Sequence, residues 1–320
     1  MSEEHLAPLL RHELDMVPPE MTQIFRDIIK YRVDPAGYYY KIDIDQIVNQ
    51  LRALDTGTVH GIDSEFRYEE KGKMFDPVIQ SFTMGAGGQI TTWDKSEPTM
   101  IPAILRGITK RKQMDLCRQR GRDFYYIDTG YFGNGKKKTY HRVTKNDVQN
   151  FGPIIERPGD RFERTGIKPA KCRADGSKIL LAPPSQKLLN LYDIDLETWL
   201  ETTLAEIATN TDREVIVRRK PGRTARTSDD SMEAALSQDI YCLITFSSIA
   251  AGEALMFGKP AITLGPNAAA PLCSQSLSEI ENIRRPSLDE IHAWCRHIAY
   301  CQFTEAEMRD GTAWRILQGG

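Results

Sequence analysis

The chain has 320 residues, 40% of them hydrophobic and 27% charged, which is typical of a soluble globular protein and sufficient for two domains. No apolar run approaches the ~18 residues of a membrane span, and the acidic N-terminal stretch lacks a signal-peptide core. We therefore expect a cytoplasmic protein with no membrane partner. The six cysteines form no CxxC pair, so we expect reduced thiols rather than a disulfide framework or a metal site.

The net charge of −2 is unevenly distributed along the chain. Residues 106–148 contain twelve Lys or Arg and four Asp, giving +8, so the remainder carries −10. A basic region on a mildly acidic protein indicates a polyanionic partner. A solvated, lysine-rich loop is the simpler alternative.

In chain order, residues 1–56 carry apolar side chains at helical spacing and predict a helical N-terminal extension without evident chemistry. A short strand at 59–62 then leads into a polar loop containing His60, Asp63 and Glu65. Polar residues beyond a strand of an α/β sheet are well placed to bind ligands, because such sheets hold ligands at the carboxyl edge. A helix at 77–83 and a strand at 89–93 complete this part.

A strand–helix–strand unit is predicted next, with strands at 100–108 and 123–127 and a charged helix at 109–120. The loop 128–133 (DTGYFG) follows the second strand, so Asp128 would lie at the carboxyl edge of the sheet. We expect residues 134–146 to form a basic loop and residues 150–177, rich in Gly, Pro and charge, to form a linker. In this region the residues suited to contact a polyanionic acceptor are Tyr131, Phe132, Lys136, Lys137, Lys138, Tyr140 and Arg142.

The second half alternates strands and helices, which predicts a parallel, doubly wound sheet. Strands are expected at 178–182, 214–218, 241–246 and 261–264, with helices near 196–207, 231–236 and 250–257. Gly258 and Pro260 end the last helix. The loops after parallel strands meet at one edge, and here they contain Ser185, Arg218, Arg219, Lys220, Ser247 and Ser248.

Ser247 and Ser248 stand where the helix at 250–257 begins, and Glu253 lies one turn inside it. Hydroxyl groups at a helix N-terminus can bind an anion, and the helix dipole favours the same charge. The glutamate could accept hydrogen bonds from a ribose diol. Alternatively, Ser248 only caps the helix and Glu253 is solvated. Capping boxes at 287–290 and 304–307 predict two C-terminal helices, ending near 303 and 317.

The phrase GEALMFGKPAITLG resembles the nucleotide-sugar site of GT-B glycosyltransferases. The segments DFYYIDTGYFGN, TYHRVTKN and TEAEMRDGTAW are similar to phage-encoded members of that group, some of which glycosylate hydroxymethylated DNA bases. The resemblance implies two Rossmann-like domains facing a central cleft. It divides the chain into the extension 1–56, an acceptor-side domain 57–170, a nucleotide-sugar domain 171–286 and C-terminal helices 287–320, which could cross back to the first domain.

The implied reaction moves a sugar from a nucleotide-diphosphate sugar to a hydroxyl, without a resident cofactor or an obligatory metal. The donor would be held by Ser185, Arg218, Arg219, Lys220, Ser247, Ser248 and Glu253. Asp128 is the first candidate for the base, and Asp63, His60 and Glu65 are the alternatives. The implied acceptor is duplex DNA in the cytoplasm of a phage host. A polysaccharide or lipid acceptor, a sugar-nucleotide epimerase and a non-catalytic nucleic-acid binder remain alternatives.

Overall fold

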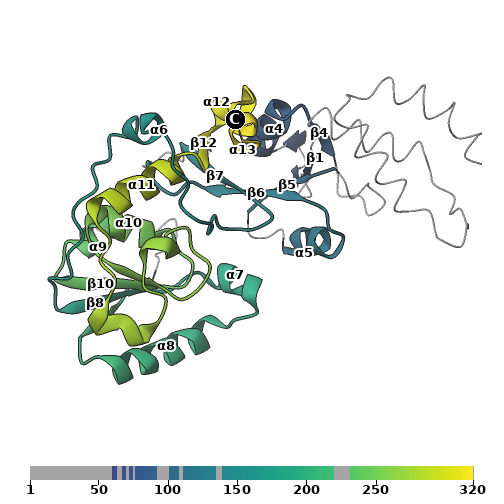
Figure 1. Ribbon diagram of the computed structural model, residues 1–320. Coiled ribbons are helices and arrows are strands. Elements are labelled where there is room, and N and C mark those ends of the chain that lie inside the picture. Colours follow the sequence, from purple (N-terminus) through teal and green to yellow (C-terminus); the bar gives the residue numbers. More distant parts are fainter. Residues whose placement is uncertain are drawn as a thin grey trace, which may run out of the picture. The chain divides into compact units, whose positions relative to one another are not determined.

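The computed structural model describes residues 60–62, 67–69, 72–74, 76–91, 101–107, 111–134, 139–219 and 231–319 (Figure 1). The predicted extension 1–56 lies outside these residues. The chain divides into two compact units. The described residues of the first lie within Met1–Leu105, Gln113–Tyr125 and Ala306–Gln318, and the second comprises Arg106–Lys112, Tyr126–Glu305 and Gly319–Gly320.

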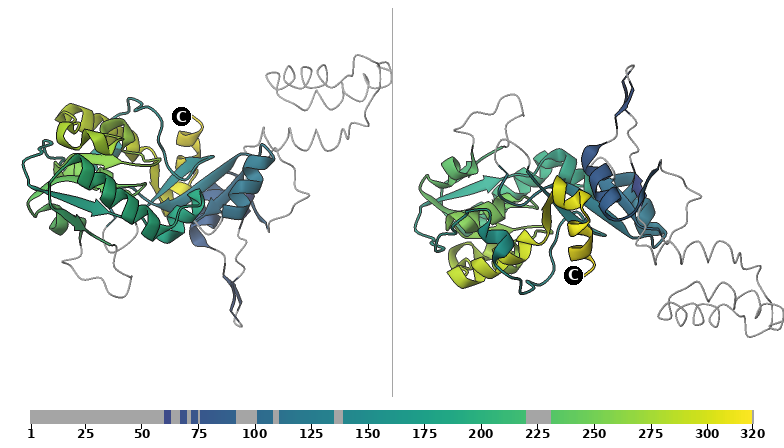
Figure 2. Two further views of the ribbon diagram at one scale, coloured as in Figure 1. Left: turned by 90° about the horizontal axis from the view of Figure 1, so that it is seen from below. Right: turned by 90° about the horizontal axis from the view of Figure 1, so that it is seen from above.

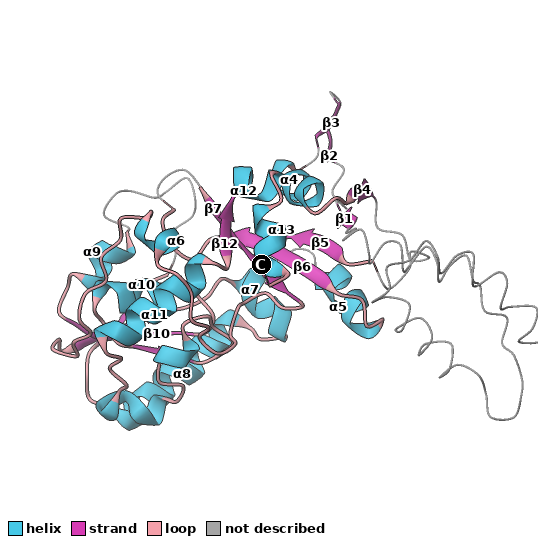
Figure 3. Ribbon diagram, turned by 45° about the horizontal axis from the view of Figure 1, so that its top comes forward, coloured by secondary structure: helices cyan, strands magenta, loops and turns pink. Residues whose placement is uncertain are grey.

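The described strands form a six-stranded sheet, a four-stranded sheet and a two-stranded sheet (magenta in Figure 3). The six-stranded sheet has the order β12-β7-β6-β5-β1-β4. Its strands are β1 (His60–Ile62), β4 (Gln89–Thr91), β5 (Ala103–Arg106), β6 (Phe124–Thr129), β7 (Tyr140–Lys145) and β12 (Gln302–Thr304). Strand β1 runs parallel to β4 and β5, and β7 runs antiparallel to β12, with Phe303 opposite His141. The two-stranded sheet pairs β2 (Arg67–Glu69) with β3 (Gly72–Met74).

In the first unit, helix α4 (Pro77–Gly85) begins as the sequence indicates, because the Asp76 side chain accepts a hydrogen bond from the Val78 amide at 3.0 Å. The ring of Phe82 in this helix packs against Tyr125 and Trp314, with ring centroids 5.9 and 6.1 Å apart, respectively. The other described helices containing residues of this unit are α5 (Arg111–Gln119), α12 (Glu305–Arg309) and α13 (Thr312–Leu317). Residues 304–317 were expected as one helix, but Gly311 has φ of +80° and separates two.

In the second unit, the four-stranded sheet has the order β11-β10-β8-β9, and all its pairs are parallel. Its strands are β8 (Lys178–Ala182), β9 (Val215–Val217), β10 (Ile240–Thr245) and β11 (Ala261–Thr263). These strands match the predicted positions within a few residues. The helices within the described residues of this unit are α6 (Asp160–Glu163), α7 (Gln186–Leu189), α8 (Leu196–Asn210), α9 (Met232–Leu236), α10 (Ala250–Phe257) and α11 (Leu288–Ala299), with 3₁₀ turns η2 (Asn190–Tyr192), η5 (Ala270–Leu272) and η6 (Leu277–Asn282).

Helices cover both faces of this sheet, as a doubly wound fold requires. Ile179 and Leu181 of β8 pack in a core with residues of α8 and η6, whereas Leu180 and Ala182 pack in a second core with α10 and α11. Figure 1 shows α8 on one side of β8 and β10 and α9, α10 and α11 on the other, and Figure 2 gives two further views of the same elements. The prediction of a mixed α/β fold with parallel strands is confirmed for this unit.

Two strands contradict the sequence prediction. Strand β7 occupies the second half of the segment 134–146 expected as a basic loop, and β12 occupies the predicted end of a helix. Both were overlooked because β7 carries polar side chains at buried positions and β12 has only three residues. Asp128 also lies within β6 rather than in the following loop. The predicted linker 150–177 contains only the short helix α6. An arrangement of two domains around a cleft stays a prediction.

Candidate functional site

The four-stranded sheet changes its winding direction between β8 and β10. From β8 the chain moves to the edge strand β9, and from β10 it moves to the opposite edge strand β11, while β8 and β10 lie side by side. In open α/β sheets, ligands bind outside the carboxyl ends of the strands at such a switch point. The segments that leave these ends are residues 183–185 after β8 and residues 246–249 after β10. We refer to residues 246–249 as the β10 turn.

The serines predicted to bind the donor lie in these two segments. Ser185 is exposed and caps α7, its hydroxyl accepting a hydrogen bond from the Leu188 amide at 3.4 Å. Ser248 is half-buried, and its hydroxyl accepts from the Ala250 amide at 3.2 Å, so its own hydrogen can still be donated. Helix α10 begins at Ala250 as expected, but Ile249 rather than Ser248 is at the cap position.

Ser247 requires a correction. Its side chain is buried and its hydroxyl donates to the backbone carbonyl of Pro266. A hydroxyl has one hydrogen to donate, so in this structure Ser247 cannot donate it to a phosphate. Its role is to tie the β10 turn to the segment after β11. Glu253, by contrast, is half-buried in the first turn of α10, as predicted.

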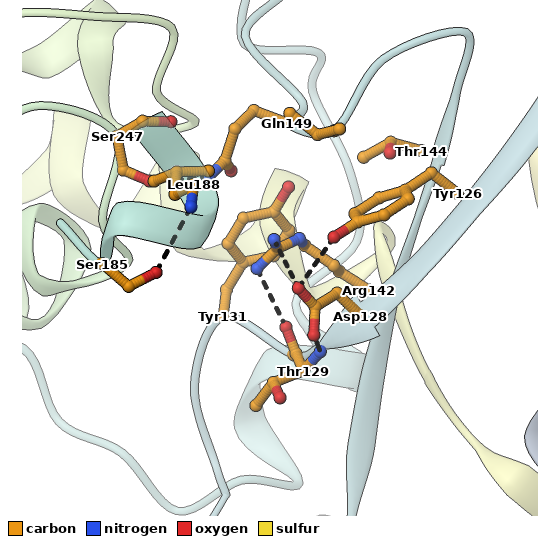
Figure 4. A network of polar contacts seen from close by, with 12 residues as sticks. Tyr126, Asp128, Thr129, Tyr131, Arg142, Thr144, Gln149, Ser185, Leu188 and Ser247 are labelled. Atoms are coloured by element: carbon orange, nitrogen blue, oxygen red, sulfur yellow. Dashed lines mark hydrogen bonds and ion pairs between the residues drawn. The ribbon is translucent and has the colours of Figure 1, made fainter. Parts of the chain in front are cut away.

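Two buried amides that the sequence did not single out hold the β10 turn. Gln149 donates to the carbonyl of Ser247 at 2.9 Å, and Asn267 donates to the carbonyl of Ser248 at 2.9 Å. Both side chains are buried. Figure 4 shows Gln149 reaching the backbone of Ser247. No sequence signal pointed to Gln149, because it follows β7, which was expected to be a loop.

Asp128 forms a polar cluster with residues of β6 and β7 (Figure 4). One of its carboxylate oxygens accepts from the Tyr126 hydroxyl at 2.9 Å and from Arg142 at 3.3 Å, and the other accepts from the Thr129 amide at 2.7 Å. Arg142 also donates to the Thr129 carbonyl at 3.1 Å. The Asp128 side chain is 36% exposed, whereas that of Arg142 is 8% exposed. The carboxylate thus contacts solvent while its cationic partner is covered.

The groups around this cluster stay in the protonation states that the ion pair needs. Burial by itself lowers the pKa of Arg142, but the charge of Asp128 and the contacts with Tyr131 and Tyr126 raise it above its ordinary value. Burial raises the pKa of both tyrosines, and the adjacent Asp128 raises that of Tyr126 further. Arg142 is therefore a permanent cation, and Tyr126 is a neutral hydrogen-bond donor to Asp128.

The two arginines that follow β9 differ in their exposure and contacts. Arg219 is exposed and forms a bidentate ion pair with Glu197 of α8, with both N–O distances 2.7 Å. This hydrogen bond and the opposite charge raise the pKa of Arg219 and lower that of Glu197. Arg218 is half-buried, and its amide donates to the Leu181 carbonyl at 2.8 Å. A contact between Arg219 and a donor would have to replace its pair with Glu197.

Tyr131 and Phe132, which were expected to contact the acceptor, are buried instead. The rings of Tyr131 and Phe132 are buried, and Phe132 packs edge-on against Phe162 and Trp294, with centroids 5.6 and 6.4 Å away. Their backbone amides both donate to the Gln302 side chain. Alternating aromatic and basic residues looked like an exposed binding surface, but here the rings belong to the core. Tyr140 is half-buried at the start of β7.

Several predicted site residues lie outside the described residues, namely Asp63, Glu65, Lys136, Lys137, Lys138 and Lys220. The side chain of His60 is likewise outside the description, although its backbone belongs to β1. All six cysteines are free thiols, and burial raises the pKa of Cys172 to about 11 and that of Cys242 to about 12. Of the helices that the structure describes, none combines the length and the apolar character needed to cross a bilayer.

No protein-family model matches the sequence, and no curated protein is significantly similar to it. Among solved structures, the chain is similar to Thermosulfurimonas dismutans KpsC, beta Kdo 2,4 transferase, with 20% identity and a TM-score of 0.42, covering 68% of this chain and 85% of the other. It is also similar to the beta Kdo 2,7 transferase of KpsC from the same organism, with 13% identity and a TM-score of 0.39, covering 74% and 97%. These structural neighbours are glycosyltransferases, and similarity at this level establishes no shared activity.

Proposed function

We propose that this protein is a glycosyltransferase that uses a nucleotide sugar and binds the donor at the β8/β10 switch point. The observation that carries the proposal is the β10 turn, which leads directly into the N-terminus of α10 at that edge. Ser248 has a hydroxyl hydrogen to donate there, and helix amides add further donors for a phosphate. Glu253 is positioned one turn inside the helix, where a carboxylate can accept from ribose hydroxyls.

We further propose that the acceptor is a hydroxyl of a saccharide rather than of a DNA base. Three of the residues expected to bind DNA are engaged inside the protein, and Lys136, Lys137 and Lys138 lie outside the described residues. Tyr131 and Phe132 are core residues, and Arg142 is committed to Asp128. In contrast, Phe151, two residues after Gln149, is 48% exposed and offers an aromatic face against which a sugar ring can pack.

Asp128 remains our candidate for the group that accepts the acceptor's proton. Its partial exposure supports this role, because a base must reach the proton that it removes. The pairing with Arg142 has a cost, since a nearby cation favours the ionised carboxylate and weakens it as a base. Its second function would be to stabilise positive charge near the reacting carbon. Asp63, His60 and Glu65 are the alternatives that the sequence offers.

The test has a binding arm and a transfer arm. Calorimetry with UDP, GDP and CMP should show binding of at least one nucleotide, and Ser248→Ala should weaken it by about 1.5–3 kcal/mol if a charge-assisted hydrogen bond is lost. Ser287→Ala, which removes an exposed cap from α11, is the matched control and should leave the affinity unchanged. Absence of binding to every nucleotide would refute the proposal.

Mass spectrometry would then follow transfer from a panel of nucleotide sugars to oligosaccharides and to hydroxymethylated and ordinary duplex DNA. Transfer to oligosaccharides alone is the expected result. Transfer to the modified DNA would show that the acceptor is a nucleic acid, and it would not contradict the proposed donor site. Binding of the saccharide acceptor should not depend on salt concentration, because it involves no contacts with acceptor phosphates.

A further inference from the structure

An aromatic cluster that was not part of the predicted site lies at the β8/β10 switch point. Tyr192 belongs to η2, in the connection that follows β8, and Phe246 is the first residue after β10. Their rings meet edge to face, with centroids 5.1 Å apart and planes at 73°. Tyr192 is half-buried, whereas Phe246 is 7% exposed.

Phe246 is fixed from three sides. Trp199 of α8 approaches it edge-on with centroids 6.3 Å apart, and Tyr192 approaches from η2. On a third side the ring lies against Gly265, where an added Cβ would come within 2.6–2.7 Å of three ring atoms. Only glycine permits this approach. The ring that supports Tyr192 is therefore held in one position.

The backbone on both sides of Tyr192 is clamped by one arginine. Arg111 forms a bidentate pair with Asp193, at 2.8 and 2.7 Å, and also donates to the carbonyl of Asn190. Asp193 has φ of +55°, a left-handed conformation that is uncommon for a residue other than glycine. Gln186 adds hydrogen bonds to the Asn190 side chain and the Ile194 carbonyl, at 2.7 and 3.0 Å. Backbone held in an uncommon conformation by such contacts is typical of binding sites.

We propose that Tyr192 is the platform on which the base of the nucleotide donor stacks, with Arg111 and Asp193 as its positioning residues. This inference rests on the proposed function. Phe246 and Ser248 are two residues apart, at most about 7 Å along the chain, so a phosphate at Ser248 places the nucleoside beside this cluster. A half-buried aromatic residue that is rigidly supported and close to the proposed phosphate site suits a nucleobase, because every base offers a π-face for stacking.

The experiment compares nucleotides with a ligand that lacks the base. Calorimetry on the full chain would use UDP, GDP and CMP, with ribose 5-phosphate as the baseless control. Tyr192→Leu, which keeps apolar contact with Phe246, and Tyr192→Ala should weaken nucleotide binding roughly 5- to 150-fold. Tyr192→Phe should retain the wild-type affinity. None of the three should change the affinity for ribose 5-phosphate. Tyr300→Ala, a change of the same size at another half-buried tyrosine, should alter neither.

Arg111→Ala tests the positioning role. It retains the Tyr192 side chain but removes the contacts that hold η2. It should therefore weaken nucleotide binding and leave ribose 5-phosphate binding unchanged. Arg111→Lys should restore nucleotide binding only in part, because a lysine cannot make the bidentate pair. The inference is overturned if the wild type binds a nucleotide and Tyr192→Leu binds it equally well. It is overturned together with the proposed function if the wild type binds no nucleotide.

Discussion

Replacing Asp128 by Asn should separate a loss of stability from a loss of activity. The substitution keeps groups that can bond to Tyr126 and Thr129 but removes the charge opposite Arg142, whose side chain is only 8% exposed. Removing one partner of a fully buried ion pair costs about 3–5 kcal/mol. Because 36% of the Asp128 side chain is exposed, water screens the pair, and we expect roughly 2 kcal/mol.

Urea denaturation of the wild type, Asp128→Asn, Arg142→Met and the double variant measures this cost. Since the penalty arises from an uncompensated guanidinium, the double variant should be less destabilised than the sum of the single changes, by about 0.5–3 kcal/mol. Additive losses would refute the reasoning, because they would mean that the two side chains do not stabilise each other.

Activity gives the second half of the test. If Asp128 accepts the acceptor's proton, turnover at a temperature where all variants are folded should fall by roughly 10²–10⁴, while nucleotide affinity stays unchanged. Tyr126→Phe removes one hydrogen bond to the carboxylate and should lower turnover far less. A folded Asp128→Asn enzyme with normal turnover would limit Asp128 to a structural role and move the role of the base to Asp63, His60 or Glu65.

Three further changes test other parts of the second unit. Gly265→Ala should destabilise the protein by roughly 1–3 kcal/mol in urea, because its Cβ would collide with Phe246, whereas Gly152→Ala, which meets nothing within 4 Å, should not. Gln149→Leu leaves the buried Ser247 carbonyl without its donor, so it should lower the free energy of unfolding by about 1–3 kcal/mol and weaken nucleotide binding in calorimetry. Unchanged binding would show that the β10 turn does not depend on Gln149. Burial and then Arg157 lower the pKa of His297 below 6.5, so the unfolded chain binds the proton more readily, and stability should fall as the pH drops from 6.5 through the lower folded value. His297→Gln should flatten that slope, and an unaltered slope would contradict this assignment.

The second unit's sheet was predictable because its signals are local. Residues 241–246 form an apolar run, and Gly258, with φ of +88°, ends α10 where the sequence placed its end. Parallel strands joined by short helices leave few topologies open. The residues that leave β8 and β10 could therefore be named from sequence, and Ser185 and Ser248 lie where they were expected.

The remaining errors concern residues whose environment depends on distant parts of the chain. Arg142 looks like an exposed basic residue, but it is buried because Asp128 neutralises it. Phe132 looks like an exposed ring in a glycine-rich loop, but residues of α6 and α11 enclose it. Neither Gln149 nor Tyr192 carries a motif, because their roles come from contacts with Ser247 and Phe246. Such pairings between distant segments have no local signature.

The pairing of β7 with β12 constrains how this protein can be made. Strand β7 ends at Lys145 and β12 ends at Thr304, so about 160 further residues must be synthesised before the two can meet. At a synthesis rate of about 5–20 residues per second, that edge of β7 stays unpaired for roughly 8–30 s while the chain is being made. An unpaired strand edge is a template for aggregation during that interval. Slow release of the last few dozen residues, or a stop codon before β12, should therefore send newly made chains to chaperones or into aggregates.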